Sequence, residues 1–297
     1  MLPKQKKLPP TVFPAVKGRT VLLCLILIVA MTFSLLLPLA SAAASNRQAV
    51  QESLDKTSEA LDAAEPIYQK LHEIIAEEIA SMGAEDDSEP DLDEAEASYE
   101  ELNGYVKQLE GLISGLGALP GDPNTSDGKT VRAAVEYLSM LRNMSADLAE
   151  LIRYSIDMYH AIEPFVMMYV DTDDYYDLAE QIWNGCEETR TLMEKIKPPA
   201  YLAITHSDML VRVTEFRDFG EDFYYACAMD DPLRMYSCIY RMNRIIRMFE
   251  ICGDNLDADL ELQLMQAERR LNGPLALLRD ELTKNLETLK NAQGRGQ

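Results

Sequence analysis

Residues 198–232 read PPAYLAITHSDMLVRVTEFRDFGEDFYYACAMDDP, and this stretch decides the fold. Pro198 and Pro199 are predicted to end one helix and begin the next, since proline fits the first helical turn. Asp231 and Pro232 repeat this signal as an N-cap followed by a first helical residue. Between them, residues recur with the period of one helix face: Leu202, His206, Met209, Val213, Phe216, Gly220, Phe223 and Cys227. The stretch therefore predicts a helix between two tight turns, with an antiparallel neighbour on each side.

The same period continues on both sides of this stretch. Before it, residues 171–174 offer N-caps for a helix that faces inward through Ile182, Cys186, Thr189, Met193 and Ile196. After it, a helix from residue 232 faces inward through Met235, Cys238, Met242, Ile245, Phe249, Cys252 and Leu256. The sequence Asn272-Gly273-Pro274 is predicted to end that helix, and a short last helix to run to about residue 291.

The N-terminal half carries longer apolar seams of the coiled-coil type. Pro66 is predicted to bend or break the first of them. Residues 85–96 are expected to form a flexible linker, because eight of these twelve side chains are acidic. The seam then resumes over 95–116. In residues 46–82 its members are Val50, Leu54, Thr57, Leu61, Ala64, Tyr68, Leu71, Ile75 and Met82.

A loop of glycine, proline and polar residues at 117–128 separates the two halves. The next helix is predicted over 129–169, with Pro164 kinking its end. No strand pattern competes, so the expected fold is all-α: an antiparallel bundle of six or seven helices with coiled-coil-like seams, preceded by an N-terminal signal or anchor helix. The expected divisions are 1–44 for the signal or anchor, 45–118 for a helical hairpin with the acidic linker, and 129–297 for a helical bundle.

Residues 1–44 have the pattern of an export signal. Five basic residues precede an apolar run over residues 20–39, and Ala40-Ser41-Ala42 has the small-residue pattern of a cleavage site. The run is also long enough to cross a bilayer, so cleavage and retention as an anchor both stay open. In either case the rest of the chain is expected to be extracytoplasmic, either secreted or membrane-anchored by residues 20–39.

The charge balance disfavours one class of partner. The chain contains 50 acidic and 28 basic residues, and its net charge is −22. Since the leader holds basic residues only, the exported part is more acidic still. Such a surface repels nucleic acid and anionic lipid headgroups, and it suits cations and basic partners.

Charges also support the hairpin around Asp231. Residues that face each other in an antiparallel hairpin have a constant sum of residue numbers. Four oppositely charged pairs across this hairpin share one such sum. A stripe of every third residue drifts round a helix, so only two of these four pairs are expected to form. The alternative interpretation is an anion site built from Arg241, Arg244 and Arg247. The four pairs are Glu215 with Arg247, Asp218 with Arg244, Glu221 with Arg241, and Arg212 with Glu250.

Export makes disulfides possible. Four cysteines follow the leader, and all of them fall on inward seams. Folding the chain at its two proline turns brings Cys186 level with Cys252 and Cys227 close to Cys238, so these are the predicted pairs. The alternative is four buried free thiols. No two of the cysteines have the spacing of zinc ligands.

Motifs for catalysis or metal binding are scarce. His160 and Glu163 share a helix face, but a di-metal site needs Glu-x-x-His pairs on two helices. His206 falls on a core seam, where a buried, hydrogen-bonded structural role is expected. No calcium, phosphate-loop or nucleophile motif is present. We therefore assign no catalytic, cofactor-binding or metal residues, and we expect neither an enzyme activity nor a cofactor.

Aromatic and methionine side chains gather between residues 154 and 183. Such a cluster fits either the end of a core or a binding face. The candidate binding face consists of Tyr159, Tyr169, Tyr175 and Trp183.

One short pattern resembles a known group of proteins. Residues 198–210, Pro-Pro-Ala-Tyr-Leu-Ala-Ile-Thr-His-Ser-Asp-Met-Leu, are similar to the pattern P-P-x-x-L-x-x-x-H-x-x-L. That pattern is met in exported prokaryotic helical-bundle proteins and lipoproteins of unknown function. The resemblance implies an exported bundle in which the prolines and His206 serve a helical turn, and it implies no activity. The chain departs from the lipoproteins because it lacks a lipid-acceptor cysteine.

Three functions are compatible with these patterns. The leading one is a non-catalytic extracytoplasmic helical module that acts through contacts with a protein partner at the cell envelope or surface. The alternative is a sensor-like bundle that binds a small ligand or a cation, and the third is a helical metalloenzyme. Membrane contact is expected only through the N-terminal segment, if it is not cleaved.

The export signal makes a prediction about location. A reporter enzyme that works only outside the cytoplasm, fused after residue 297, should be active in cells. Intact-mass analysis of the native protein then separates cleavage from anchoring. Activity of a reporter that works only inside the cytoplasm would contradict the export hypothesis.

Overall fold

A computed structural model describes the backbone of residues 18–82, 91–119, 124–166 and 174–294. Side chains are described from residue 47 onward, so the predicted signal or anchor at 1–44 lies outside the described side chains. The chain divides into two compact units, Met1–Glu52 and Ser53–Gln297, and the second unit holds the hydrophobic core of the bundle. Among the residues with described side chains, no helix has an apolar run long enough to cross a bilayer.

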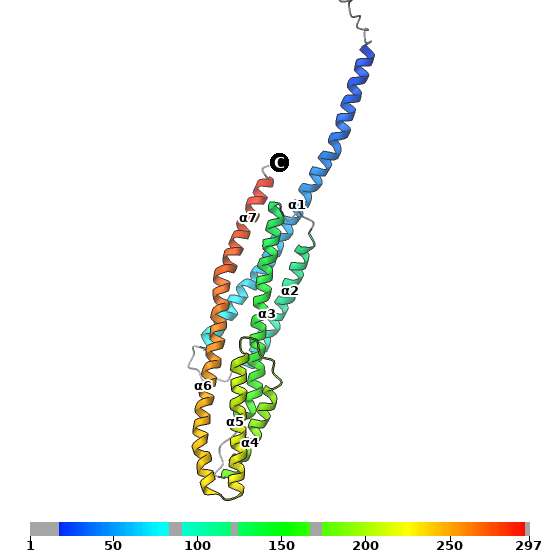
Figure 1. Ribbon diagram of the computed structural model, residues 1–297. Helices are drawn as coiled ribbons and strands as arrows, with labels where there is room; N and C mark the ends of the chain where they lie inside the picture. Colours follow the sequence, from blue (N-terminus) through cyan, green and yellow to red (C-terminus); the bar gives the residue numbers. More distant parts are fainter. Residues whose placement is uncertain (1–17, 83–90, 120–123, 167–173, 295–297) are drawn as a thin grey trace, which may run out of the picture. The chain divides into compact units, whose positions relative to one another are not determined.

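The prediction of an all-α fold with antiparallel helix contacts is confirmed (Figure 1). In Ser53–Gln297, neighbouring helices pack as α2 on α3, α3 on α4, α4 on α5 and α5 on α6, and α7 packs on α3. The helices are α1 (Gly18–Met82), α2 (Leu92–Gly117), α3 (Ser126–Val166), α4 (Tyr175–Met193), α5 (Ala203–Ala228), α6 (Pro232–Arg270) and α7 (Ala276–Gly294), with a π-helical turn η1 (Leu271–Leu275) between the last two.

Aspartate N-caps begin three of these helices. The Asp231 carboxylate accepts hydrogen bonds from the backbone N–H groups of Leu233 and Arg234, both at 3.1 Å, and Pro232 is the first helical residue. The predicted start of α6 is therefore confirmed. Asp174 caps α4 in the same way. Asp91 caps α2 by accepting from the Glu94 N–H at 3.1 Å.

The start of α5 differs from the prediction. Pro199 does not begin the helix: its carbonyl accepts from the Leu202 N–H at 2.9 Å, which closes a turn, and α5 begins at Ala203. The turn satisfies backbone groups that a helix start would otherwise leave open.

Two predicted interruptions, a break at Pro66 and the full length of the acidic linker, are corrected, and a third takes a different form. Helix α1 continues through Pro66, where Ala64 and Ile67 on either side are buried in the core. The acidic linker is shorter than predicted, because residues 92–96 already belong to α2. Helix α6 does end just before Asn272-Gly273-Pro274, at Arg270, but the chain then passes through the π-helical turn η1 directly into α7, without a loop.

The π turn explains how a proline fits into this long helix. A wider turn accommodates a residue that lacks an N–H group and would clash in an α-helix. Leu271 and Leu275, at the two ends of η1, are buried, and the Tyr68 hydroxyl donates to the Leu271 carbonyl at 3.3 Å. The guanidinium of Arg279 lies over the Tyr68 ring at 4.5 Å and pairs with Glu65 at 3.2 Å. These contacts hold η1 and the start of α7 against α1.

The core follows the predicted seams. On the seam that runs from Leu202 along α5, every predicted inward residue is buried except Cys227, which is half-buried. The prediction missed Phe219, which is fully buried and stacks between Phe216 and Phe223 at ring distances of 5.5 and 5.7 Å. It also missed a second buried row on α1, formed by Ala60, Ile67 and Ile74.

Gly220 marks the closest approach of α4 to α5. A Cβ at this position would lie 2.7 Å from the backbone nitrogen of Trp183 and 2.9 Å from Ile182 Cγ2. Backbone cannot yield as a flexible side chain can, so only glycine allows this helix contact.

Gly220→Ala should therefore destabilise the protein by about 1–3 kcal/mol, as overpacking of a close contact does. Gly253 in α6 is the matched control, because a Cβ there meets nothing within 4 Å. Gly253→Ala should stabilise by up to about 1 kcal/mol, since alanine is the better helix former. Urea unfolding followed by circular dichroism measures both changes. Equal effects of the two substitutions would show that the close contact is absent in solution.

Candidate functional site

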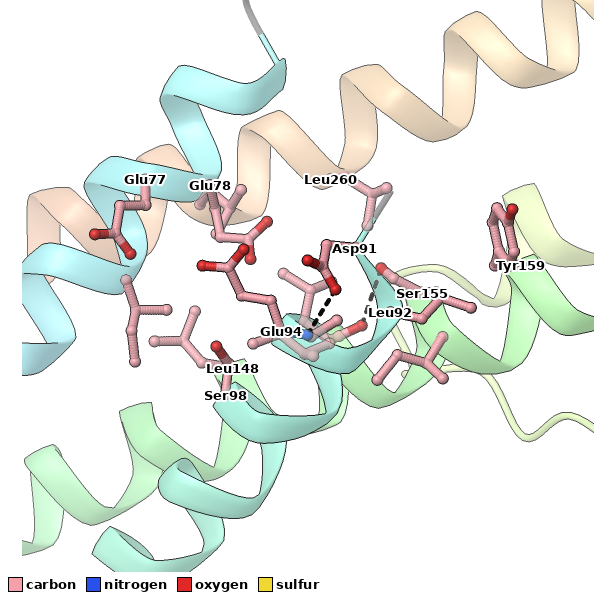
Figure 2. Close-up of a pocket in the computed structure, with 16 residues that line it drawn as sticks. Glu77, Glu78, Asp91, Leu92, Glu94, Ser98, Leu148, Ser155, Tyr159 and Leu260 are labelled. Carbon is pink, nitrogen blue, oxygen red and sulfur yellow. Dashed lines mark hydrogen bonds between the residues drawn. The ribbon is translucent and has the colours of Figure 1, made fainter. Parts of the chain in front are cut away.

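A cavity of about 510 Å³ lies among four helices of the second unit (Figure 2). Helices α1, α2, α3 and α6 each contribute side chains to it. Most of its lining is aliphatic: Ile74, Leu92, Ala95, Leu148, Leu151, Ile152, Ile156, Leu260 and Leu264. Binding pockets for small molecules have volumes of roughly 300–1,000 Å³ and a mostly apolar lining, so this cavity has the size and character of such a pocket.

Four carboxylates distinguish this cavity from an ordinary packing gap. Glu77 and Glu78 come from the last turns of α1, and Asp91 and Glu94 come from the start of α2. Figure 2 shows the Glu77, Glu78 and Glu94 side chains on the α1–α2 side of the cavity. The predicted seams explain this placement. Apolar residues of α1, α2 and α3 share one core, and the four carboxylates lie close to the end of α1 and the start of α2.

The electrostatics of the site centre on Glu78. Burial raises the pKa of its carboxyl group above the ordinary value, and the negative charges of Glu94 and Glu77 raise it further. Each of these effects disfavours the ionised form. A positive charge placed beside Glu78 and Glu94 would relieve the repulsion between them. Asp91 already has a separate role, as the N-cap of α2.

Hydroxyl groups supply the remaining polar atoms of the lining. Ser98 from α2 and Ser155 and Tyr159 from α3 reach the cavity (Figure 2). Among the residues that the structure describes, no group of three or more His, Cys, Asp or Glu side chains is arranged to hold a metal ion. The cavity thus combines carboxylates on one side with an apolar surface around the rest.

The predicted binding face is divided between two places. Tyr159 lines the cavity, whereas Tyr175 and Trp183 belong to α4 and pack on α5. The Tyr175 ring contacts Phe223 at 6.3 Å, and the Trp183 ring contacts Tyr224 at 5.5 Å. Tyr169 lies outside the described residues.

His206 has the predicted structural role. It is 6% exposed, and its Nδ1 lies 3.3 Å from the Tyr154 hydroxyl of α3. Burial lowers the pKa of its imidazole, while a hydrogen bond to the Met193 backbone of α4 acts in the opposite direction. The side chain therefore joins α5 to two other helices, and it does not line the cavity.

All four described cysteines are free thiols, so the structure contains neither predicted disulfide. Burial raises the pKa of the Cys186 thiol to about 12, and it also raises the pKa values of Cys227 and Cys238. Cys238 adds to the shift at Cys227, which shows that these two thiols are neighbours. The pairing of Cys186 with Cys252 and of Cys227 with Cys238 stays a prediction for the oxidised protein.

The predicted charge pairs of the α5–α6 hairpin are wrong. None of the four predicted pairs forms an ion pair in the α5–α6 hairpin that the structure describes. Asp222 instead pairs with Arg234 at 3.4 Å and with Arg241 at 2.7 Å. The stripe of every third residue that suggested the pairs turns away from the partner helix too quickly. Because Arg241 is already engaged by Asp222, it does not join Arg244 and Arg247 in the alternative anion site.

Sequence reasoning missed the carboxylates of the cavity. The apolar seam of residues 46–82 skips Glu78 without giving it a role, and Asp91 and Glu94 fall in the predicted acidic linker. Their position in the sequence was the one indication of a shared site. They lie on either side of the point where the first apolar seam ends and the second begins.

Comparison with known proteins gives no further assignment: no family model, no curated protein and no solved structure matches the chain.

Proposed function

We propose that this chain is a non-catalytic binding module of the extracytoplasmic space, and that its cavity takes an apolar organic cation. The observation that carries the proposal is the cavity of about 510 Å³ with Glu78 and Glu94 on one side and aliphatic side chains around the rest. The proposal follows the small-ligand alternative from the sequence, and it specifies the charge and polarity of the ligand.

The two parts of the cavity would contribute differently to binding. The aliphatic lining favours an apolar body, at about 25 cal/mol for each Å² of apolar surface removed from water. The carboxylates add selectivity for charge, because electrostatic interactions are stronger at a partly buried site than in bulk water. A neutral or negatively charged ligand of the same shape would leave Glu78 and Glu94 repelling each other.

The location in this proposal rests on the N-terminal pattern at residues 1–44. A module outside the cytoplasm that binds organic cations would serve as a sensor-like ectodomain or as a carrier. Protein contacts at the envelope, the leading function from sequence, are compatible with ligand binding, because the cavity uses only part of the surface of α1, α2, α3 and α6.

A matched pair of probes tests the charge selectivity. With the full chain in zwitterionic nanodiscs, 4-phenylbutylamine should bind at least about tenfold more tightly than 4-phenylbutyrate, a difference of about 1.4 kcal/mol. The two probes share an apolar body and differ in the sign of their charge. Isothermal titration calorimetry measures both affinities.

Variants then assign the selectivity to the cavity. Glu78→Gln should weaken binding of the amine by about fivefold, as loss of a partly buried charge contact does. Glu59→Gln is the control on the same helix, since Glu59 is exposed and does not line the cavity. Equal binding of amine and carboxylate, or an equal loss in both variants, would overturn the proposal.

The same substitution makes a prediction about stability. Since the folded protein raises the pKa of Glu78, the ionised carboxylate destabilises the fold at neutral pH. Glu78→Gln should therefore increase the free energy of unfolding near pH 7 by roughly 1 kcal/mol or less. The difference should disappear below about pH 4, where the wild-type carboxyl is protonated in both states. Urea titrations at both pH values measure this, and a variant destabilised at neutral pH would contradict a raised pKa of Glu78 in the folded protein.

A further inference from the structure

The outward face of α6 is apolar and basic. Leu233 is 84% exposed, Tyr236 76% and Tyr240 80%, and Arg244, Arg247 and Ile251 continue the same row as exposed side chains. These six residues, the outer stripe, follow one another at steps of three, four, four, three and four. Such steps keep them on one helix face, opposite the face on which Cys238, Ile245 and Cys252 are buried.

The composition of this stripe differs from the rest of the acidic surface. Residues 232–249 contain four arginines and no acidic residue, in a chain with a net charge of −22. Arg234 and Arg241 pair with Asp222 of α5, whereas Arg244 and Arg247 have no ion-pair partner among the described residues. Tyrosine and arginine are among the residues enriched at the centres of protein interfaces.

We propose that the outer stripe binds a second copy of this chain, with the two α6 helices antiparallel and a two-fold axis passing beside Tyr240. This inference is independent of the cavity. The pattern that carries it is self-complementarity, as an isologous interface requires.

The pairing follows from a constant sum of residue numbers, here 480. Tyr240 meets Tyr240 of the other copy, and Tyr236 meets Arg244, which places a guanidinium against an aromatic ring. Leu233 comes level with Arg247, whose aliphatic stem covers apolar surface. At the ends, Ile251 comes level with Met229, which is 68% exposed in the turn before α6. No arginine of the stripe faces an arginine, and both ends of the contact are apolar.

The chemistry of the chain favours a second copy over a lipid surface. An anionic membrane is extended, so it would meet the whole acidic molecule and not only this stripe. In a side-by-side helix pair only the two stripes meet, and there Arg244 lies beside a tyrosine ring and Arg247 beside Leu233 of the other copy, so that no arginine faces an arginine. The contact runs from residue 233 to residue 251, about 27 Å along the helix, which suits a reversible dimer.

The test uses the full-length chain in a neutral detergent. Analytical ultracentrifugation should show a dimer whose fraction rises with protein concentration, and Leu233→Glu should reduce association by at least tenfold. Circular dichroism checks that the variant folds. A chain that is monomeric at all concentrations, or a dimer that Leu233→Glu leaves intact, would overturn the proposal.

Disulfide trapping tests the position of the axis. Under mild oxidation Tyr240→Cys should form a covalent dimer, because this residue meets its own copy. Tyr236→Cys is the matched control on the same face, since antiparallel pairing puts it about 12 Å along the axis from its copy. Equal trapping of both variants would exclude the antiparallel arrangement. Binding to anionic vesicles by a chain that stays monomeric, if abolished by Leu233→Glu, would assign the stripe to a membrane surface and overturn the proposal.

Discussion

The buried imidazole of His206 fixes the relation between three helices. It lies on α5, its Nδ1 lies beside the Tyr154 hydroxyl of α3, and the imidazole also hydrogen-bonds to the backbone of Met193 on α4. A buried polar group without a partner costs about 1–3 kcal/mol, so the three helices are held at positions that satisfy it. Apolar seams alone would allow sliding along the helix axes, because leucine and phenylalanine pack acceptably in several registers. The placement of α3 in turn sets one wall of the cavity, and the placement of α5 sets the support of α6.

Local chemistry explains which parts of the fold were predictable. The start of α6 depends on one carboxylate and one proline, and both act within four residues of sequence. The role of His206 followed from its position on an apolar seam. By contrast, the path of the chain through Asn272-Gly273-Pro274 depends on Tyr68 and Arg279, which are distant in sequence or lie beyond the turn. A proline signal says that an α-helix is strained at that point, but packing decides whether the strain ends the helix or widens one turn.

The candidate site was predictable only in its parts. Tyr159 was singled out from an aromatic cluster, and the cavity gives it a place. Glu78 and Glu94 belong to different helices, and nothing in their spacing shows that they meet. A charge run indicates a solvated surface unless the apolar residues on the other side of the same helices are known to enclose space. A cavity forms where several packed helices do not fill the space between them. The periodicity of a single sequence does not show where that happens.

The π turn has a mechanical consequence. Since η1 joins α6 to α7 without a break, residues 232–294 form one rod of about 90 Å. An α-helix resists bending along its length, and a π turn is a point at which it yields. We therefore expect any bending of the rod at η1, where Tyr68 of α1 contacts Leu271 and Arg279. Helix α6 contributes Leu260 and Leu264 to the cavity wall. A force applied to α6 near Tyr240 would therefore act on the cavity wall before it acted on η1.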